Sequence, residues 1–168
     1  MRIRFERPAD VDDIRAVNKY AFGTPAEADL IEALRRAASP LVSLVAEEGG
    51  AIAGHILFSR VTLSSDPNLR IAGLAPMAVM PARQRLGIGS ALVRAGLEEC
   101  RSAGFLAVAV LGHRTFYPRF GFVPASRFGI ASTYDVSDDV FMMRELEPGA
   151  LREKRGVIHY HAAFAGVS

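Results

Sequence analysis

The spacing of apolar and polar residues along the chain predicts which segments form strands and which form helices. Residues 2–6 alternate in polarity, which predicts a short strand at the start. Apolar residues then recur every three or four positions, in a helix that opens at Pro8 and in a second helix over residues 25–37. Ser39 and Pro40 are expected to end that second helix. The inward-facing positions expected on the two helices are Val11, Ile14, Val17, Leu30, Ile31 and Leu34.

The next apolar runs predict a hairpin followed by a returning strand. Residues 41–47 and 51–61 are strand-like, and residues 48–50 (Glu-Gly-Gly) join them in a turn, because glycine tolerates positive φ. A second turn is expected over residues 64–68, and the strand that follows it over residues 69–79.

The second half of the chain predicts one helix with a clear buried face and several strands. An apolar stripe follows Gly89, with charged residues on the opposite face, and Gly104 supplies the stop. The stripe consists of Leu92, Val93, Gly96, Leu97 and Cys100. Residues 105–111 form an unbroken apolar run, which is typical of a strand buried on both faces. Further strands are expected over residues 120–122, 140–146 and 157–164.

This order of elements predicts an α/β protein. Along the chain the order is β-α-α-β-β-β-α-β-α-β-β, which implies a mixed sheet with helices on both faces. No internal repeat, low-complexity tract or linker-like stretch divides the sequence, so a single domain is expected over residues 1–168.

Composition and charge narrow the class of protein. Half of the residues are hydrophobic, yet no apolar run approaches the ~18 residues of a membrane span, so no membrane partner is expected. Residues 1–10 carry charges where a secretion signal has its apolar stretch, and we therefore expect a cytoplasmic protein. The net charge is +2 and the basic residues are scattered, which does not indicate nucleic-acid binding. The single cysteine, Cys100, rules out an internal disulfide, and its position on the helix stripe predicts a buried apolar role.

Residues 84–89, Gln-Arg-Leu-Gly-Ile-Gly, follow a predicted strand and open a helix. A helix start exposes backbone N–H groups at the positive end of the helix dipole and therefore attracts anions. Gly87 and Gly89 allow an anion closer than a side chain would, and Arg83 and Arg85 bring cationic groups. The segment is not a Walker loop, since no Gly-Lys-Ser/Thr follows, and it lacks the third glycine of a dinucleotide fingerprint. We expect a pyrophosphate site.

Two blocks match, in the correct order, the signatures of a known family. Residues 79–89, Val-Met-Pro-Ala-Arg-Gln-Arg-Leu-Gly-Ile-Gly, fit the pattern V-x-P-x-x-[QR]-x-x-G-x-[GA]. Residues 117–122, Tyr-Pro-Arg-Phe-Gly-Phe, fit Y-x-x-x-G-F, and residues 7–14 are a common start for the same fold. The chain thus resembles the GCN5-related N-acetyltransferases (GNAT family). The resemblance implies a mostly antiparallel sheet with one splayed parallel strand pair, and transfer of an acetyl group from acetyl-CoA to a primary amine in a ternary complex.

The resemblance also implies how acetyl-CoA binds, between the splayed strands over residues 71–79 and 105–111. Pantetheine would pair with the backbone of Met77, Ala78 and Val79. The pyrophosphate would lie on the amides of Gln84, Arg85, Leu86, Gly87, Ile88, Gly89 and Ser90. Pro76 interrupts the first strand, and proline within a strand favours an edge or a bulge. We expect a bulge there, and the hypothesis is that the N–H of Met77 or Val79 stabilises the oxyanion of the reaction.

Tyr117 is the candidate general acid that the resemblance implies, because a phenol with an ordinary pKa of about 10 can protonate the leaving thiolate. No clear base for the attacking amine is visible, and a chain of water molecules would serve as well. His113, which follows the predicted strand at 105–111, is the leading candidate. The other candidates are His55, Glu27 and Asp29.

Other interpretations stay open at this point. His159 and His161 alternate on one strand face but lack a neighbouring carboxylate or third ligand, so no metal is expected.

A domain of the same fold could bind acyl-CoA without turnover, as a sensor or interaction module. Tyr117 favours the enzyme, and the missing base favours the silent module. An unrelated nucleotide-phosphate binder would require the match at residues 117–122 to be chance. The amine acceptor, a small molecule or a peptide, is not encoded in any recognisable motif, and a homodimer through late strands is among the expected assemblies.

Overall fold

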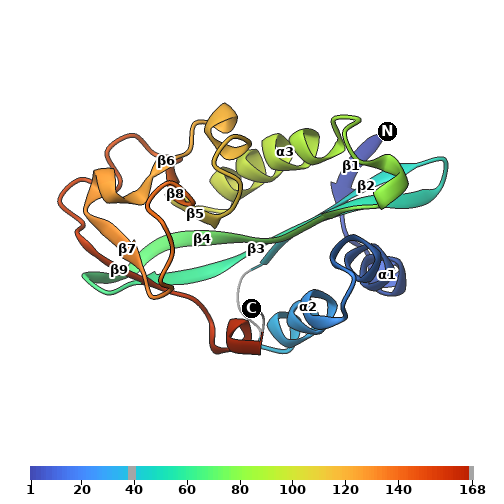
Figure 1. Cartoon of the computed structure of the whole chain (residues 1–168), viewed down its shortest axis with the longest axis horizontal. Coiled ribbons are helices and arrows are strands. Elements are labelled where there is room, and N and C mark those ends of the chain that lie inside the picture. The colour runs from blue at the N-terminus through green and yellow to red at the C-terminus, as the bar shows by residue number, and fades with distance from the viewer. Residues whose placement is uncertain (38–40, 167–168) are drawn as a thin grey trace. The chain divides into compact units, whose positions relative to one another are not determined.

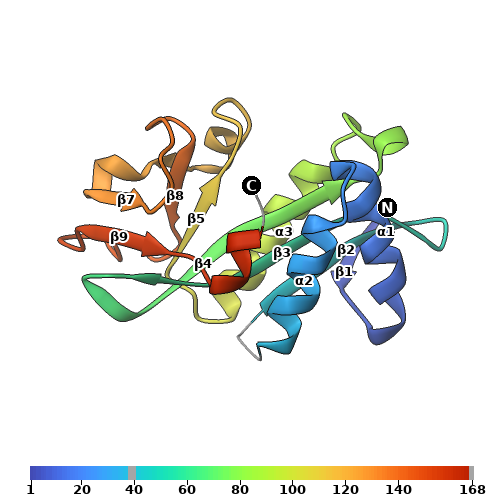
Figure 2. The ribbon, with the colours of Figure 1, turned by 60° about the horizontal axis from the view of Figure 1, so that its bottom comes forward.

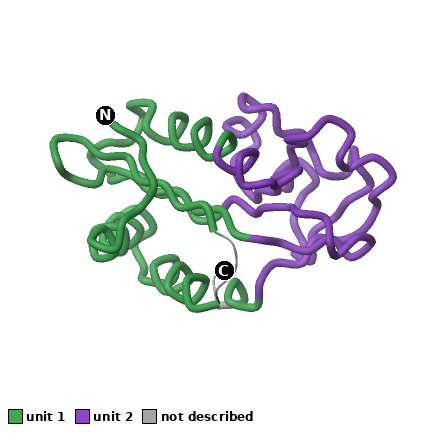
Figure 3. The backbone as a smooth tube through the Cα atoms, turned by 180° about the vertical axis from the view of Figure 1, so that it is seen from behind, with its two compact units in different colours: residues 1–59, 75–98, 162–168 green, residues 60–74, 99–161 purple. Residues whose placement is uncertain are grey.

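The computed structural model describes residues 1–37 and 41–166, and contacts between residues divide the chain into two compact units. The first unit comprises residues 1–59, residues 75–98 and the C-terminal segment from Ala162, and the second comprises residues 60–74 and 99–161 (Figure 3). The single domain expected from the sequence stays a prediction.

Helices, strands and short 3-10 turns make up the described chain. The α-helices are α1 (Val11–Phe22), α2 (Ala26–Arg36) and α3 (Ile88–Ser102). The strands are β1 (Arg2–Phe5), β2 (Leu41–Glu48), β3 (Ala51–Leu63), β4 (Asp66–Val79), β5 (Ala107–Leu111), β6 (Val123–Pro124), β7 (Ile130–Ser132), β8 (Phe141–Glu145) and β9 (Gly156–His159). The 3-10 helices are η1 (Pro8–Asp10), η2 (Pro81–Arg83), η3 (Tyr117–Phe120), η4 (Ala125–Phe128) and η5 (Ala162–Gly166). The strands β3 and β4 and the helix α3 contribute residues to both units.

In the first unit, β1 pairs antiparallel with β2, and β2 pairs antiparallel with β3. The turn between β2 and β3 consists of Gly49 and Gly50, whose φ angles of 56° and 82° suit a two-residue hairpin turn. The helices α1 and α2 lie on one face of these strands and α3 lies on the other (Figure 1). The predicted hairpin and the predicted helices on both faces are therefore confirmed.

The predicted inward faces of α1 and α2 are also confirmed, because five of the six named positions are buried and Val11 is partly buried. The buried five are Ile14, Val17, Leu30, Ile31 and Leu34. Gly23 follows α1 with a left-handed φ of 76°, and its N–H donates to the carbonyl of Lys19. The expected helix end at Ser39 and Pro40 lies outside the described residues.

The stripe predicted for α3 faces inward, and Gly104 follows the helix with a φ of 90°. Gly96 within that stripe has a packing role, because a Cβ built on it would lie 2.3 Å from the ring of Phe58 on β3. Phe58 is fully buried, and side chains in a protein interior are closely packed, so its ring cannot move aside at little cost. Glycine therefore lets α3 approach β3 closely.

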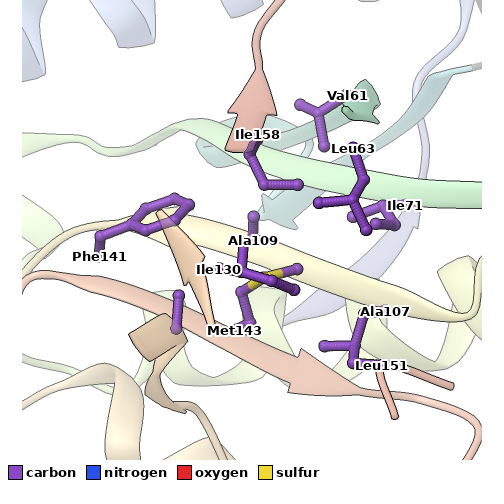
Figure 4. Close-up of a cluster of buried hydrophobic side chains, with 11 residues drawn as sticks. Val61, Leu63, Ile71, Ala107, Ala109, Ile130, Phe141, Met143, Leu151 and Ile158 are labelled. Carbon is purple, nitrogen blue, oxygen red and sulfur yellow. The ribbon is translucent and has the colours of Figure 1, made fainter. Parts of the chain in front are cut away.

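In the second unit, β4 runs parallel to β5, with a register from Ile71–Ala107 to Leu74–Val110. The strand β8 is antiparallel to both β5 and β6, and β9 is antiparallel to β3 and parallel to β7. Their side chains form a buried cluster that includes Val61, Ile71, Ala109, Ile130, Phe141, Met143 and Ile158 (Figure 4). The predicted mixed, mostly antiparallel sheet with a parallel β4–β5 pair is confirmed.

Several predicted boundaries were wrong. The turn after β3 consists of Ser64 and Ser65, and β4 begins at Asp66, three residues earlier than expected. The strand β5 begins at Ala107 instead of Phe105, because Phe105 still closes the end of α3 with its N–H on the carbonyl of Cys100.

The late strands were predicted least well. Residues 120–122 are not a strand: η3 ends at Phe120, and Gly121 turns the chain with a φ of 87°. The strand predicted over 157–164 stops at His159, and η5 follows it. The helix predicted after β5 is only the short η3, and β7 was missed because three residues carry too little periodicity to show a strand.

Candidate functional site

The loop between β4 and α3 turns sharply before the helix begins. The 3-10 turn η2 is followed by Arg85 and Gly87, which have left-handed φ angles of 64° and 87°. A left-handed φ is uncommon for a residue other than glycine, so the backbone of the loop is in an unfavourable conformation at Arg85. The carbonyl of Gly87 accepts the N–H of Ala91 at 3.0 Å, which makes Gly87 the N-cap residue of α3.

The backbone amides of this loop are free. None of the turn and cap hydrogen bonds in the described chain uses the N–H of any residue from 85 to 90, and the first amides of a helix have no intrahelical acceptor. Residues 84–87 are exposed, and the side chain of Leu86 is 62% exposed. A row of unpaired N–H groups at the positive end of a 15-residue helix therefore faces solvent, which is the chemistry of an anion site.

Contacts within the first unit hold this loop in place. The side-chain amide of Gln84 donates to the carbonyl of Val79 at 3.0 Å, and the N–H of Met80 donates to the carbonyl of Ala53 at 2.8 Å. A Cβ on Gly54 would lie 3.0 Å from Ile88 Cγ2, so glycine on β3 allows the start of α3 to come close to the strand. The sequence prediction missed Gly54, although an isolated glycine within a strand often marks a close approach.

Arg83 does not lie where the sequence led us to expect it. Its guanidinium forms an ion pair with Glu48 at the end of β2, so it does not add charge to the amide row. Arg85 makes no ion pair or side-chain hydrogen bond with the described residues, and it is exposed. Of the two arginines, only Arg85 is available to an anion at this loop.

The residues predicted to pair with pantetheine, Met77, Ala78 and Val79, form the end of β4 in the first unit. The strand is continuous through the buried Pro76, and the Ala75–Pro76 peptide is cis. The register between β4 and β5 ends at Leu74, while β4 continues to Val79. The bulge expected at Pro76, and the oxyanion role of Met77 or Val79, stay predictions.

Tyr117 lies in the second unit, at the start of η3, with its ring buried. Gly112 makes room for it, because a Cβ on Gly112 would lie 2.2 Å from the ring. Phe116 and Phe122 contact the ring edge-to-face, with centroids at 5.0 Å and 5.7 Å. Burial raises the pKa of Tyr117 to about 12, so the hydroxyl stays protonated at neutral pH.

His113 lies in the same loop, four residues before Tyr117. Its side chain is exposed, and its backbone carbonyl accepts the N–H groups of Phe116 and Tyr117 at 3.1 Å and 3.4 Å. The backbone of His113 therefore orients the turn that carries Tyr117, while its ring is accessible to solvent.

His55 is fully buried in the first unit and belongs to a neutral hydrogen-bond network. Asn18 donates from Nδ2 to the carbonyl of Ile14, which fixes the orientation of the amide, and also to Nδ1 of His55 at 3.3 Å. The Nε2 of His55 then carries the proton and donates to Oγ of Ser43 at 2.9 Å. Burial, helped by the charge of Arg35, lowers the pKa of His55 to about 3. These features argue for a structural histidine and against a catalytic base.

The remaining candidates have local partners or lie apart from any cluster. Glu27 accepts a long hydrogen bond from Thr24 at 3.4 Å, and Asp29 pairs with Arg15 at 2.9 Å on the exposed side of α2. The side chains of His159 and His161 are exposed. Across residues 1–37 and 41–166, no three His, Cys, Asp or Glu side chains gather closely enough to hold a metal ion.

Two further findings concern the chain as a whole. Cys100 is buried, and burial raises the pKa of its thiol to about 12, in agreement with the predicted apolar role. Among the helices of the described residues, none has both the length and the hydropathy that crossing a membrane requires.

Comparison with known proteins places these features in a family. The family model described as the acetyltransferase (GNAT) family matches residues 9–122. The uncharacterized N-acetyltransferase YjhQ of Escherichia coli K12 is 42% identical over 147 residues, covering 82% of this chain and 80% of YjhQ. The uncharacterized N-acetyltransferase YhbS of the same strain is 32% identical over 165 residues and 98% of each chain.

Solved structures agree with the sequence relatives. The crystal structure of YhbS from Escherichia coli in complex with CoA superposes with a TM-score of 0.94 at 31% identity, over 99% of this chain and 93% of that one. A GNAT family acetyltransferase from Brucella melitensis in complex with acetyl-CoA gives a TM-score of 0.81 at 37% identity, over 97% of each chain. The chain described here therefore belongs to the acetyltransferase (GNAT) family.

Proposed function

We propose that this acyltransferase transfers the acetyl group of acetyl-CoA to a primary amine by direct attack within a ternary complex. The row of unpaired amides from Arg85 to Ser90, at the start of α3, carries the proposal, because it offers several N–H donors to one pyrophosphate. The complexes of the relatives with CoA and acetyl-CoA support the same cosubstrate here.

The first unit supplies the binding groups of this proposal. The amides of residues 85–90 hold the pyrophosphate, whereas the N–H of Gln84, which the sequence prediction included, donates to the carbonyl of Pro81 at 3.5 Å. Arg85 adds the one cationic side chain that no carboxylate among the described residues neutralises at this loop. The backbone of Met77, Ala78 and Val79 pairs with the pantetheine arm. The hydrogen bond from Gln84 to the carbonyl of Val79 ties these two binding segments together.

Tyr117 supplies the proton in the proposed reaction. The amine nitrogen forms a bond to the acetyl carbon, the carbon–sulfur bond breaks, and the Tyr117 hydroxyl gives its proton to the leaving thiolate sulfur. The raised pKa of Tyr117, about 12, keeps that proton in place until the thiolate forms. His113, whose ring is exposed, takes the proton of the attacking amine directly or through water.

The amide row is tested by replacing Gly87 with alanine. Gly87→Ala forces an L side chain into a φ of 87°, so the loop backbone is expected to shift, and its N–H groups then no longer converge on one anion. Isothermal calorimetry is expected to show a Kd for acetyl-CoA about tenfold higher than in the wild type, or about 1.4 kcal/mol. Gly149→Ala is the control, since Gly149 has a φ of 83° and equally open surroundings. An unchanged Kd in Gly87→Ala would contradict the proposal.

A silent acyl-CoA-binding module is the second candidate, because no hydrogen bond or ion pair with the described residues orients the exposed ring of His113, the proposed base. The two candidates differ in turnover. Release of the CoA thiol in the presence of a panel of amines identifies the enzyme, whereas binding without release with every amine identifies the silent module. The acceptor, a homodimer and a cytoplasmic location stay predictions.

A further inference from the structure

A hollow of about 480 Å³ lies within the second unit and has no part in the proposed reaction. Two segments line it, residues 126–129 around η4 and residues 151–155 before β9. Three of the lining side chains are guanidinium groups, those of Arg127, Arg152 and Arg155. The volume is within the range of small-ligand sites.

The backbone around this hollow is fixed by pairing between the two segments. The strand β7, which follows η4, runs parallel to β9, and the N–H of Gly156 donates to the carbonyl of Gly129 at 3.2 Å (Figure 2). A Cβ on Gly129 would lie 2.7 Å from Cγ of Arg155, so this glycine makes room for the stem of the arginine. The N–H of Leu151 donates to the carboxylate of Glu145 at 2.9 Å and holds the second segment. The hollow is thus built on ordered backbone.

The three arginines gather at one hollow with no carboxylate partner among the described residues. Elsewhere, ion pairs hold Arg4, Arg15, Arg35, Arg83, Arg114 and Lys154. Within the part of the chain that the structure describes, no ion pair or side-chain hydrogen bond involves Arg127, Arg152 or Arg155. Glu153 is the one acidic residue in the lining, and it also forms no ion pair with the described residues. All three arginines are exposed, so solvent and salt screen their mutual repulsion, and a multivalent anion between them would remove what repulsion remains.

We propose that this hollow binds a small molecule through a phosphate or diphosphate group. Guanidinium groups donate paired N–H bonds to phosphate oxygens, and three of them around one cavity match a multiply charged oxyanion better than a single carboxylate. The proposal is independent of the pyrophosphate loop, because the two regions share no residue: the loop at 84–90 belongs to the first unit and the hollow belongs to the second.

Inorganic pyrophosphate is the probe, and the loop at 84–90 is first saturated with coenzyme A so that only other sites respond. Calorimetry on the full chain is expected to show one further binding event of pyrophosphate. In the Arg127→Gln/Arg155→Gln variant its affinity falls about tenfold or more, because two of the three charges are gone. Amide NMR signals of Gly129 and Gly156 are expected to shift during the same titration in the wild type.

The control variant is Arg36→Gln, which removes an equal exposed charge on α2 in the first unit and is expected to leave the pyrophosphate affinity unchanged. Thermal unfolding of each variant confirms that it is folded. No second binding event in the wild type overturns the proposal. An event of equal affinity in the arginine variant, or one that leaves Gly129 and Gly156 unshifted, also overturns it.

Discussion

Tyr117 can occupy its position because the neighbouring residue is the glycine Gly112. The ring fills the space that the missing side chain of Gly112 leaves, and two phenylalanine rings hold its edges. The hydroxyl is the polar end of a side chain that is otherwise packed among apolar groups, and the same burial raises its pKa. A packed ring with a protonated hydroxyl suits a proton donor of fixed position, which leads to a test that leaves the packing in place.

Tyr117→Phe is expected to lower kcat by about ten- to a hundredfold, because the ring stays in place while the proton for the leaving thiolate is lost. The Kd for acetyl-CoA is expected to stay within about twofold of the wild type, since the hydroxyl holds none of the proposed binding contacts. Steady-state thiol release and calorimetry measure the two quantities. Tyr134→Phe removes an exposed tyrosine hydroxyl as the control. Equal kcat values in Tyr117→Phe and the wild type would remove Tyr117 from the mechanism.

Single residues also show which features of the site could be predicted from the sequence and which could not. The amide row could be predicted, because a helix start and its glycines are local features of residues 84–90. The ion pair of Arg83 with Glu48 could not, since the two residues are 35 positions apart and meet only when β2, β3 and β4 have formed the sheet. The same holds for His55, whose partner Asn18 is 37 positions away. Side-chain roles that depend on a distant partner need the fold first.

At the scale of elements, the contact between α3 and β3 rests on a missing side chain. Gly96→Ala raises the helix propensity of α3 by about 1 kcal/mol, but it places a methyl group against the buried ring of Phe58. Overpacking of this kind costs about 1–3 kcal/mol, so we expect the variant to be less stable than the wild type. In a Phe58→Leu background the clash is gone, and Gly96→Ala is expected to become neutral or stabilising. Urea unfolding of the four proteins measures both effects, and the same sign in both backgrounds would refute the close contact.

Helices and strands whose apolar residues recur at a regular spacing were predicted well. The helices α1, α2 and α3 were recognised from their apolar spacing, and the β2–β3 hairpin from its two glycines. The strands β6 and β7 are two and three residues long, and their hydrogen bonds come from β8 and β9, which lie much later in the chain. Their strand character is set by the partner and not by their own sequence, which is why the apolar pattern at residues 120–122 was misassigned.

At the scale of the whole molecule, the buried His55 makes stability depend on pH. Its pKa is about 3 in the folded chain and about 6.5 when unfolded, so below pH 6.5 the unfolded state binds a proton that the folded state does not. The contribution of His55 is therefore complete above pH 6.5 and is lost progressively as the pH falls towards 3. Between pH 7 and pH 5 the expected loss is about 2 kcal/mol of unfolding free energy.

Urea unfolding at pH 7, 6 and 5 measures this loss in a range where carboxylates with ordinary pKa values stay ionised. His55→Gln keeps a polar side chain beside Ser43 but has no proton to gain, so its stability is expected to change much less over the same range. His159→Gln removes an exposed histidine and is expected to keep the steep pH dependence of the wild type. If His55→Gln and His159→Gln show the same slope, the titrating group is not His55, and the buried Asn18–His55–Ser43 network does not set the acid stability of the fold.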